Sequence, residues 1–276
     1  MIDSNRFSFS AKKIQDFIDC ERRYELRYIL NQSWPAITSE PILEIESNIK
    51  RGNEFHYLVH QFFSGVPKKT LKKTICDDVM INWFDNFLSF HKTLKIKSFF
   101  SEFPLTAQIG RDKFTAIYDL IYLNENEEIN IVDWKTSKHI SKKNILALKV
   151  QSILYPFILN EIYTEFLPGS NYSPEKISMR YWYPSSPTEN IVFQYGRETH
   201  EINRKFLKNT IGEMHKKRAG EFILTKDERK CGFCPYRSLC NRGISASNFI
   251  ESESYSVDER NLFPDFDQLP EIYFDG

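Results

Sequence analysis

The fold is decided by residues 101–135, which read SEFPLTAQIGRDKFTAIYDLIYLNENEEINIVDWK. Apolar and β-branched residues form three runs in this stretch, separated by turn-rich breaks at residues 110–113 and 124–128. An alternation of period two is typical of strands, and Gly, Asn and Asp between such runs are typical of tight turns. The segment therefore predicts three consecutive antiparallel strands.

Two aspartates and a lysine stand among the apolar residues of these strands. Asp119 interrupts the second run, and Asp133 and Lys135 close the third. A partly buried charge must be paired, neutralised or bound to a metal. Because side chains alternate along a strand, Asp133 and Lys135 are expected on one face and Trp134 on the other. Two carboxylates from neighbouring strands and one amine predict a site for a divalent metal and a phosphate.

Further motifs flank this site along the chain. Gly52-x-x-x-His56 lies upstream in a helical pattern, and Gln151-x-x-x-Tyr155 lies downstream in another. With Asp119 and the sequence IVDWKTSK, they resemble the PD-(D/E)XK nucleases, in particular the RecB-like branch with its IVDYKTG form. Four cysteines resemble those that hold an iron-sulfur cluster in the AddB nuclease domain and in the CRISPR-adaptation exonucleases. They are Cys20, Cys231, Cys234 and Cys240.

The resemblance implies a metal-dependent deoxyribonuclease, with single-stranded DNA attacked from an end as its expected substrate. Oxygen ligands suit hard cations such as Mg²⁺ or Mn²⁺. The implied ligands are His56, Asp119, Asp133 and the carbonyl of Trp134. Lys135 is expected to orient the attacking water or to stabilise charge on the phosphate, while Gln151 and Tyr155 guide the DNA strand. Glu102 on the first strand is a candidate further carboxylate, with a surface charge as the alternative.

The cysteine spacing points to a bound metal centre. Cys231-x2-Cys234-x5-Cys240 supplies three thiolates, so a fourth ligand must come from elsewhere in the chain. The resemblance supplies Cys20, which would link the two ends of the fold. Spacing alone leaves zinc and a 4Fe-4S cluster open. The resemblance, with Pro235 directly after Cys234, favours the cluster; Cys76 is expected to be a buried apolar thiol.

The predicted fold class is α/β (α+β), with a restriction-endonuclease-like core in which helices flank a mixed central sheet. Residues 1–243 are expected to form one nuclease domain, and residues 244–276 an acidic tail that is flexible or docks on a surface. The pattern predicts helices over residues 10–30 (with Cys20 inside), 46–64, 77–94, 141–166 and 201–220. It also predicts two more strands, over residues 177–183 and 191–195.

Composition is that of a globular protein, since 41% of the 276 residues are hydrophobic. No apolar run approaches the roughly 18 residues of a membrane span, and no signal peptide is evident, so a cytoplasmic protein is expected, nucleoid-associated if bacterial. The net charge of zero hides a division. Residues 1–243 hold 36 basic and 29 acidic residues, a net charge of +7 that favours phosphate binding.

Two departures from the family pattern and two alternative functions stay open. Ala116 and Ser137 stand where the RecB-like pattern has glycine. The first alternative is an inactive iron-sulfur subunit that binds DNA in a helicase-nuclease complex; the second is a zinc-linked protein-interaction module. The chain has no phosphate-loop motif, so any unwinding requires a partner, such as a helicase or a CRISPR-adaptation protein. Polarity, exonuclease or endonuclease action, and the choice among repair, recombination and CRISPR processing also stay open.

Overall fold

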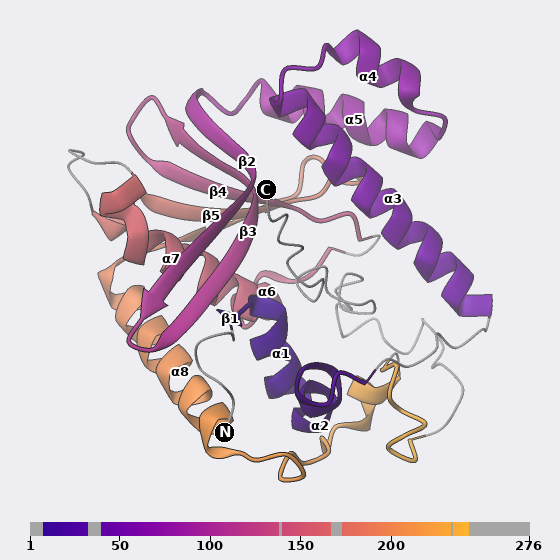
Figure 1. The fold of residues 1–276 in the computed structure, drawn as a ribbon. Helices are drawn as coiled ribbons and strands as arrows, with labels where there is room; N and C mark the ends of the chain where they lie inside the picture. Colours follow the sequence, from indigo (N-terminus) through magenta and orange to yellow (C-terminus); the bar gives the residue numbers. More distant parts are fainter. Residues whose placement is uncertain (1–7, 33–39, 138–139, 167–172, 233, 243–276) are drawn as a thin grey trace, which may run out of the picture.

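A computed structural model describes residues 8–32, 40–137, 140–166, 173–232 and 234–242. Its centre is a mixed sheet of six strands in the order β1-β3-β4-β5-β6, with β2 on the other edge of β3. The described part thus has the mixed sheet flanked by helices that the sequence predicts (Figure 1). The strands are β1 (Ser8–Phe9), β2 (Ile96–Ile109), β3 (Asp112–Asn124), β4 (Ile129–Trp134), β5 (Ile177–Trp182) and β6 (Asn190–Gln194).

The three predicted strands are confirmed as β2, β3 and β4, and their turns have local causes. Ile109 pairs with Asp112, which leaves a two-residue loop that Gly110 enters with a φ of 63°. That backbone conformation suits glycine in hairpin turns. Between β3 and β4, the side-chain oxygen of Asn124 accepts from the amides of Asn126 and Glu128, closing the second turn.

Helices cover both faces of the sheet and create two cores. The α7-side core packs β3 and β5 against α1, α7 and α8, whereas the α3-side core packs the opposite face against α3 and α5 (Figure 1). All six residues of β4 are buried because they lie between these layers. The helices are α1 (Ala11–Asp19), α2 (Glu21–Tyr24), α3 (Glu40–Phe63), α4 (Lys68–Thr74), α5 (Asp78–His91), α6 (Lys143–Ala147), α7 (Val150–Phe166) and α8 (Arg197–Lys216).

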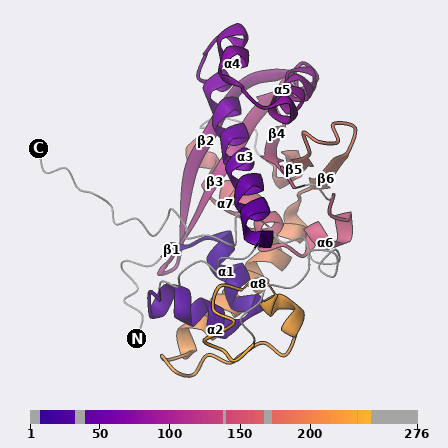
Figure 2. The same cartoon turned by 90° about the vertical axis from the view of Figure 1, so that its right-hand side faces the viewer.

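The segment that follows α8 returns to the N-terminal helices (Figure 2). The amide of Arg22 donates to the carbonyl of Ile223 at 3.0 Å, and the hydroxyl of Tyr236 donates to the carbonyl of Gln32 at 3.0 Å. A short 3-10 helix, η3 (Glu228–Cys231), carries the first of the three C-terminal cysteines. Residues far apart in sequence therefore meet beside α1 and α2.

Several predicted details are wrong. The expected helix over residues 10–30 is broken into α1, α2 and the π-helix η1 (Glu25–Ile29), and Cys20 lies at the break with an extended backbone. The expected helix over 141–166 is likewise two helices, α6 and α7. Cys76 is exposed, because it precedes α5 in a connecting loop. The acidic tail, residues 244–276, lies outside the described residues.

Candidate active site

Asp119 and Glu102 lie opposite each other where the regular alternation of β2 and β3 breaks. Ser101 pairs with Leu120 and Phe103 with Tyr118, which places Glu102 across from Asp119. Tyr118 belongs to the α7-side core and Leu120 to the α3-side core, although two residues so spaced would share a face of a regular strand. Glu102 has a φ of 49°, in the left-handed region that disfavours a side chain. This paired irregularity brings the two carboxylates together.

His56, on α3, completes a compact group of three potential metal ligands. Its Nδ1 lies 3.4 Å from Asp119 Oδ1 and 3.6 Å from Glu102 Oε1. Its Nε2 lies 3.1 Å from the carbonyl oxygen of Trp134. One nitrogen and two oxygens, from the three side chains, all lie within 4.8 Å of one another.

The proton on the His56 ring follows from its surroundings. A carbonyl oxygen only accepts hydrogen bonds, so Nε2 of the neutral ring carries the proton that it donates to Trp134. In this tautomer Nδ1 has a lone pair that a cation can share with the two carboxylates. Glu102 Oε1 is buried and has no hydrogen-bond partner among the described residues. Three acceptors that face one another fit a small cation with oxygen and imidazole ligands.

A second group lies at the end of β4 and the start of α7. Lys135 Nζ lies 2.8 Å from Asp133 Oδ2 and donates to Gln151 Oε1 at 2.8 Å. Gln151 Nε2 donates to the other oxygen of Asp133, which closes a triangle of polar contacts. Asp133 is 1% exposed, so this pairing is what allows its charge to be buried. The ammonium of Lys135 also lies 5.2 Å from the ring centre of Tyr181.

The backbone of Trp134 connects the two groups. Its amide donates to Asp119 Oδ2 at 2.8 Å, and its carbonyl accepts from His56. Gly52 lies one helical turn before His56, and a Cβ added there would lie 2.6 Å from Oγ1 of Thr136. Glycine at this position therefore lets α3 approach the end of β4 closely.

Comparison with known proteins identifies the family of this chain. A family model described as the PD-(D/E)XK nuclease superfamily matches residues 8–241. The chain belongs to the PD-(D/E)XK nuclease superfamily. No curated protein matches the sequence.

Two solved structures are similar to this chain at low sequence identity. The structure of SSO0001 is 14% identical, with 85% of this chain and 86% of that chain covered and a TM-score of 0.40. A "Putative exonuclease" from Eubacterium rectale is 13% identical, with 92% and 96% covered and a TM-score of 0.49.

PD-(D/E)XK nucleases use divalent metals, and the residues that the sequence assigns to such an ion lie in the two groups described above. The structure brings His56 and Asp119 together, with Glu102 as the third potential ligand. Asp133 lies instead in the triangle with Lys135 and Gln151. The carbonyl of Trp134 is engaged by His56, although a carbonyl oxygen has a second lone pair. The sequence indicates Glu102 only as a candidate further carboxylate, because it is an acidic residue within an apolar strand.

Tyr155 lies one helical turn after Gln151, and it packs against the α7-side core. Its carbonyl accepts from the hydroxyl of Tyr118 at 2.7 Å, and the two rings lie 4.9 Å apart. Burial raises the pKa of Tyr118 well above its ordinary value, so this phenol stays protonated and donates. Tyr155 is thus tied to the residue that precedes Asp119.

The four cysteines influence one another electrostatically. Burial, and after it the thiols of Cys234, Cys20 and Cys240, raise the pKa of Cys231 to about 11. Burial also raises the pKa of Cys234 and of Cys240. Among the described residues, however, only the His56 group is compact enough to hold one ion, so the structure does not show the predicted four-cysteine link. No described helix is long and apolar enough to cross a membrane.

Proposed function

We propose that the protein is a Mg²⁺- or Mn²⁺-dependent deoxyribonuclease that hydrolyses phosphodiester bonds at the ends of single-stranded DNA. The observation that carries the proposal is the convergence of His56, Glu102 and Asp119, joined through Trp134 to the triangle of Asp133, Lys135 and Gln151. The group of His56, Glu102 and Asp119, here called the cation-binding group, lies next to the ammonium of Lys135, and this combination is suited to a phosphate under nucleophilic attack.

The residues would divide the chemistry between them. His56, Glu102 and Asp119 would hold a divalent ion, which when bound would supply an activated water and offset charge on the scissile phosphate. Lys135 orients that water or stabilises negative charge as it develops on the phosphate oxygens. Asp133 and Gln151 keep its Nζ in place, each within 2.8 Å. Preorganised charge of this kind costs no rearrangement during the reaction.

Two exposed aromatic side chains support a single-stranded substrate. Phe99 and Phe100 lie on β2 shortly before Glu102, and their rings pack against Phe63 and Phe103, respectively, while 42% and 39% of their surface stays exposed. Unpaired bases stack on exposed rings, whereas paired bases are hidden in the duplex. Such an enzyme would act in the cytoplasm on ends opened by a partner such as a helicase, in DNA repair, recombination or CRISPR-type processing.

The test compares two histidines of the same helix. Purified wild-type protein, His56→Gln and His60→Gln are incubated with single-stranded DNA labelled at the 5′ or 3′ end, with Mg²⁺, Mn²⁺ or EDTA. We expect metal-dependent degradation by the wild type and by His60→Gln, and loss of at least about 100-fold in His56→Gln and in Asp133→Ala. The order in which label is released gives the polarity. Wild-type protein that binds DNA but degrades none with either metal would identify an inactive DNA-binding subunit instead.

We further propose that Cys20, Cys231, Cys234 and Cys240 hold a 4Fe-4S cluster. The fold supports this, because Cys20 lies at the break between α1 and α2, and the segment that carries the other three cysteines returns to these helices, where the amide of Arg22 donates to the carbonyl of Ile223. Anaerobic purification with iron, sulfide and zinc assays is the test, and about four irons and four sulfides per chain are expected. One zinc and a colourless protein would mean a zinc site, and no bound metal would refute both.

A further inference from the structure

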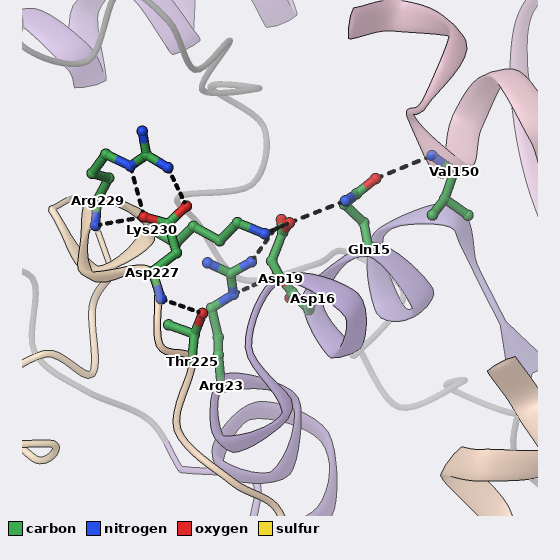
Figure 3. Close-up of polar contacts among 9 residues, drawn as sticks. All are labelled: Gln15, Asp16, Asp19, Arg23, Val150, Thr225, Asp227, Arg229 and Lys230. Carbon is green, nitrogen blue, oxygen red and sulfur yellow. Dashed lines mark hydrogen bonds and ion pairs between the residues drawn. The ribbon is translucent and has the colours of Figure 1, made fainter.

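The first turn of α7 is held in place from α1. Gln15 Oε1 accepts from the amide of Val150 at 3.0 Å, and Gln15 Nε2 donates to Asp19 Oδ1 at 3.2 Å (Figure 3). Val150 is the first residue of α7 and directly precedes Gln151. The first amides of a helix have no acceptor within it, so a side chain from another helix satisfies one of them here.

Asp19 carries this contact on to the cysteine-bearing segment. The same oxygen, Oδ1, accepts from Lys230 Nζ at 3.0 Å, while Oδ2 accepts from Arg23 at 3.1 Å (Figure 3). Lys230 directly precedes Cys231. A continuous series of polar contacts therefore runs from the residue before Cys231, through Asp19 and Gln15, to the residue before Gln151.

The position of Gln151 matters because it contacts both of its partners at once. It donates to Asp133 and accepts from Lys135, so a shift of the helix start lengthens both contacts together. Pro156 lies within α7 and has no amide hydrogen, which removes one hydrogen bond of the helix close to Gln151. The first turn consequently depends more on what holds it from outside.

We infer that Gln15 is a positioning residue of the nuclease centre. It fixes the start of α7, and with it Gln151, and through Asp19 and Lys230 it makes this position depend on the segment that carries the C-terminal cysteines. The inference rests on the proposed nuclease function, and it adds a residue that touches neither DNA nor metal.

Two substitutions of Gln15 separate the roles of its two ends. Gln15→Glu keeps an acceptor for the Val150 amide but cannot donate to Asp19, whereas Gln15→Ala removes both contacts. Asn124→Ala is the control, because Asn124 closes the β3–β4 turn through the amides of Asn126 and Glu128, at the end of β4 away from Asp133. Lys230→Met breaks the bridge and leaves every cysteine in place.

Steady-state digestion of single-stranded DNA and amide hydrogen exchange of residues 150–152 are measured on each full-length variant. In Gln15→Ala we expect kcat to fall about fivefold, as for loss of one capping hydrogen bond, with KM within about twofold and faster exchange of these amides. Gln15→Glu, which keeps the Val150 contact and loses the Asp19 contact, should have a kcat between those of Gln15→Ala and the wild type, and Lys230→Met should lower kcat by no more than Gln15→Glu does. Asn124→Ala should lower the melting temperature without changing kcat.

The inference fails if Gln15→Ala speeds exchange but leaves kcat unchanged, or if its loss of rate only matches that of the Asn124 control. It also fails if exchange of residues 150–152 is the same in wild type and Gln15→Ala. A wild-type protein without nuclease activity would refute the proposed function alone, because the exchange measurements would still report whether Gln15 and Lys230 hold the start of α7.

Discussion

Replacing Gly52 with alanine is expected to damage the active site through one contact. The added Cβ would lie 2.6 Å from Thr136 Oγ1, whereas ordinary van der Waals contact begins at 3.4 Å. The two atoms must separate by the difference, 0.8 Å. Thr136 directly follows Lys135, and Gly52 lies one turn before His56 on the same side of α3. Either element that moves therefore carries a site residue with it.

The size of the effect follows from this displacement. A misplacement of about 1 Å in an active site can cost about 100-fold in rate, so we expect Gly52→Ala to lower kcat at least about tenfold. Stability should change less. Alanine favours a helix by about 1 kcal/mol over glycine, and overpacking typically costs about 1–3 kcal/mol. The free energy of unfolding should thus fall by no more than about 2 kcal/mol.

A second substitution tests the cause directly. Thr136→Ala removes Oγ1 and leaves only Cβ of residue 136, at 3.6 Å, which is an ordinary contact. The double variant Gly52→Ala/Thr136→Ala should therefore recover the kcat of Thr136→Ala alone, measured on end-labelled single-stranded DNA, with urea unfolding as the stability control. A wild-type kcat for Gly52→Ala, or a double variant no faster than Gly52→Ala, would refute the steric argument.

Three further predictions concern other parts of the molecule. Cys231→Ser should lose bound iron and lower the melting temperature, while Cys76→Ser, at an exposed thiol, should change neither. Burial lowers the pKa of His200, so the unfolded protein binds a proton at this residue more readily than the folded protein does. The free energy of unfolding in urea should therefore be full above about pH 6.5 and decrease below it, and the decrease should be smaller in His200→Gln. Trp134→Phe removes an indole N–H that is buried without a partner among the described residues, so its cost in urea unfolding should stay below the roughly 3–5 kcal/mol of Trp134→Ala.

The strands were predictable because their causes are local. Alternating residues in β2, β3 and β4, with Gly110 and Asn124 at the turns, are read directly from the sequence. The break in alternation at Glu102 and Asp119 was not, because a period of two assumes that each strand is regular. Cys20 was misplaced for a similar reason: the apolar spacing continues past residue 20 although the backbone becomes extended there.

The contents of the site were only partly predictable. His56, Asp119 and Lys135 carry motif spacing, which a single sequence displays. The contact of Glu102 with His56 and Asp119 depends on the packing of β2 against α3, and no spacing along the chain encodes that. Gln15 offers no signal at all, since its contact with Val150 joins residues 135 positions apart.

Trp134 explains why the two polar groups form one site. β4 pairs with β3 only as far as Val132, opposite Leu120, while its pairing with β5 continues to Trp134. The amide of Trp134 therefore has no backbone carbonyl of β3 to donate to, and it donates to the side chain of Asp119 instead. Its indole lies in the α3-side core against Phe87 and holds the end of β4 in position. The carbonyl of Trp134 accepts from His56. Trp134 therefore holds Asp119 through its amide and His56 through its carbonyl. A shift at the end of β4 would move the carboxylate, the imidazole and Lys135 together, which makes the separation of β4 from β3 the structural origin of the site.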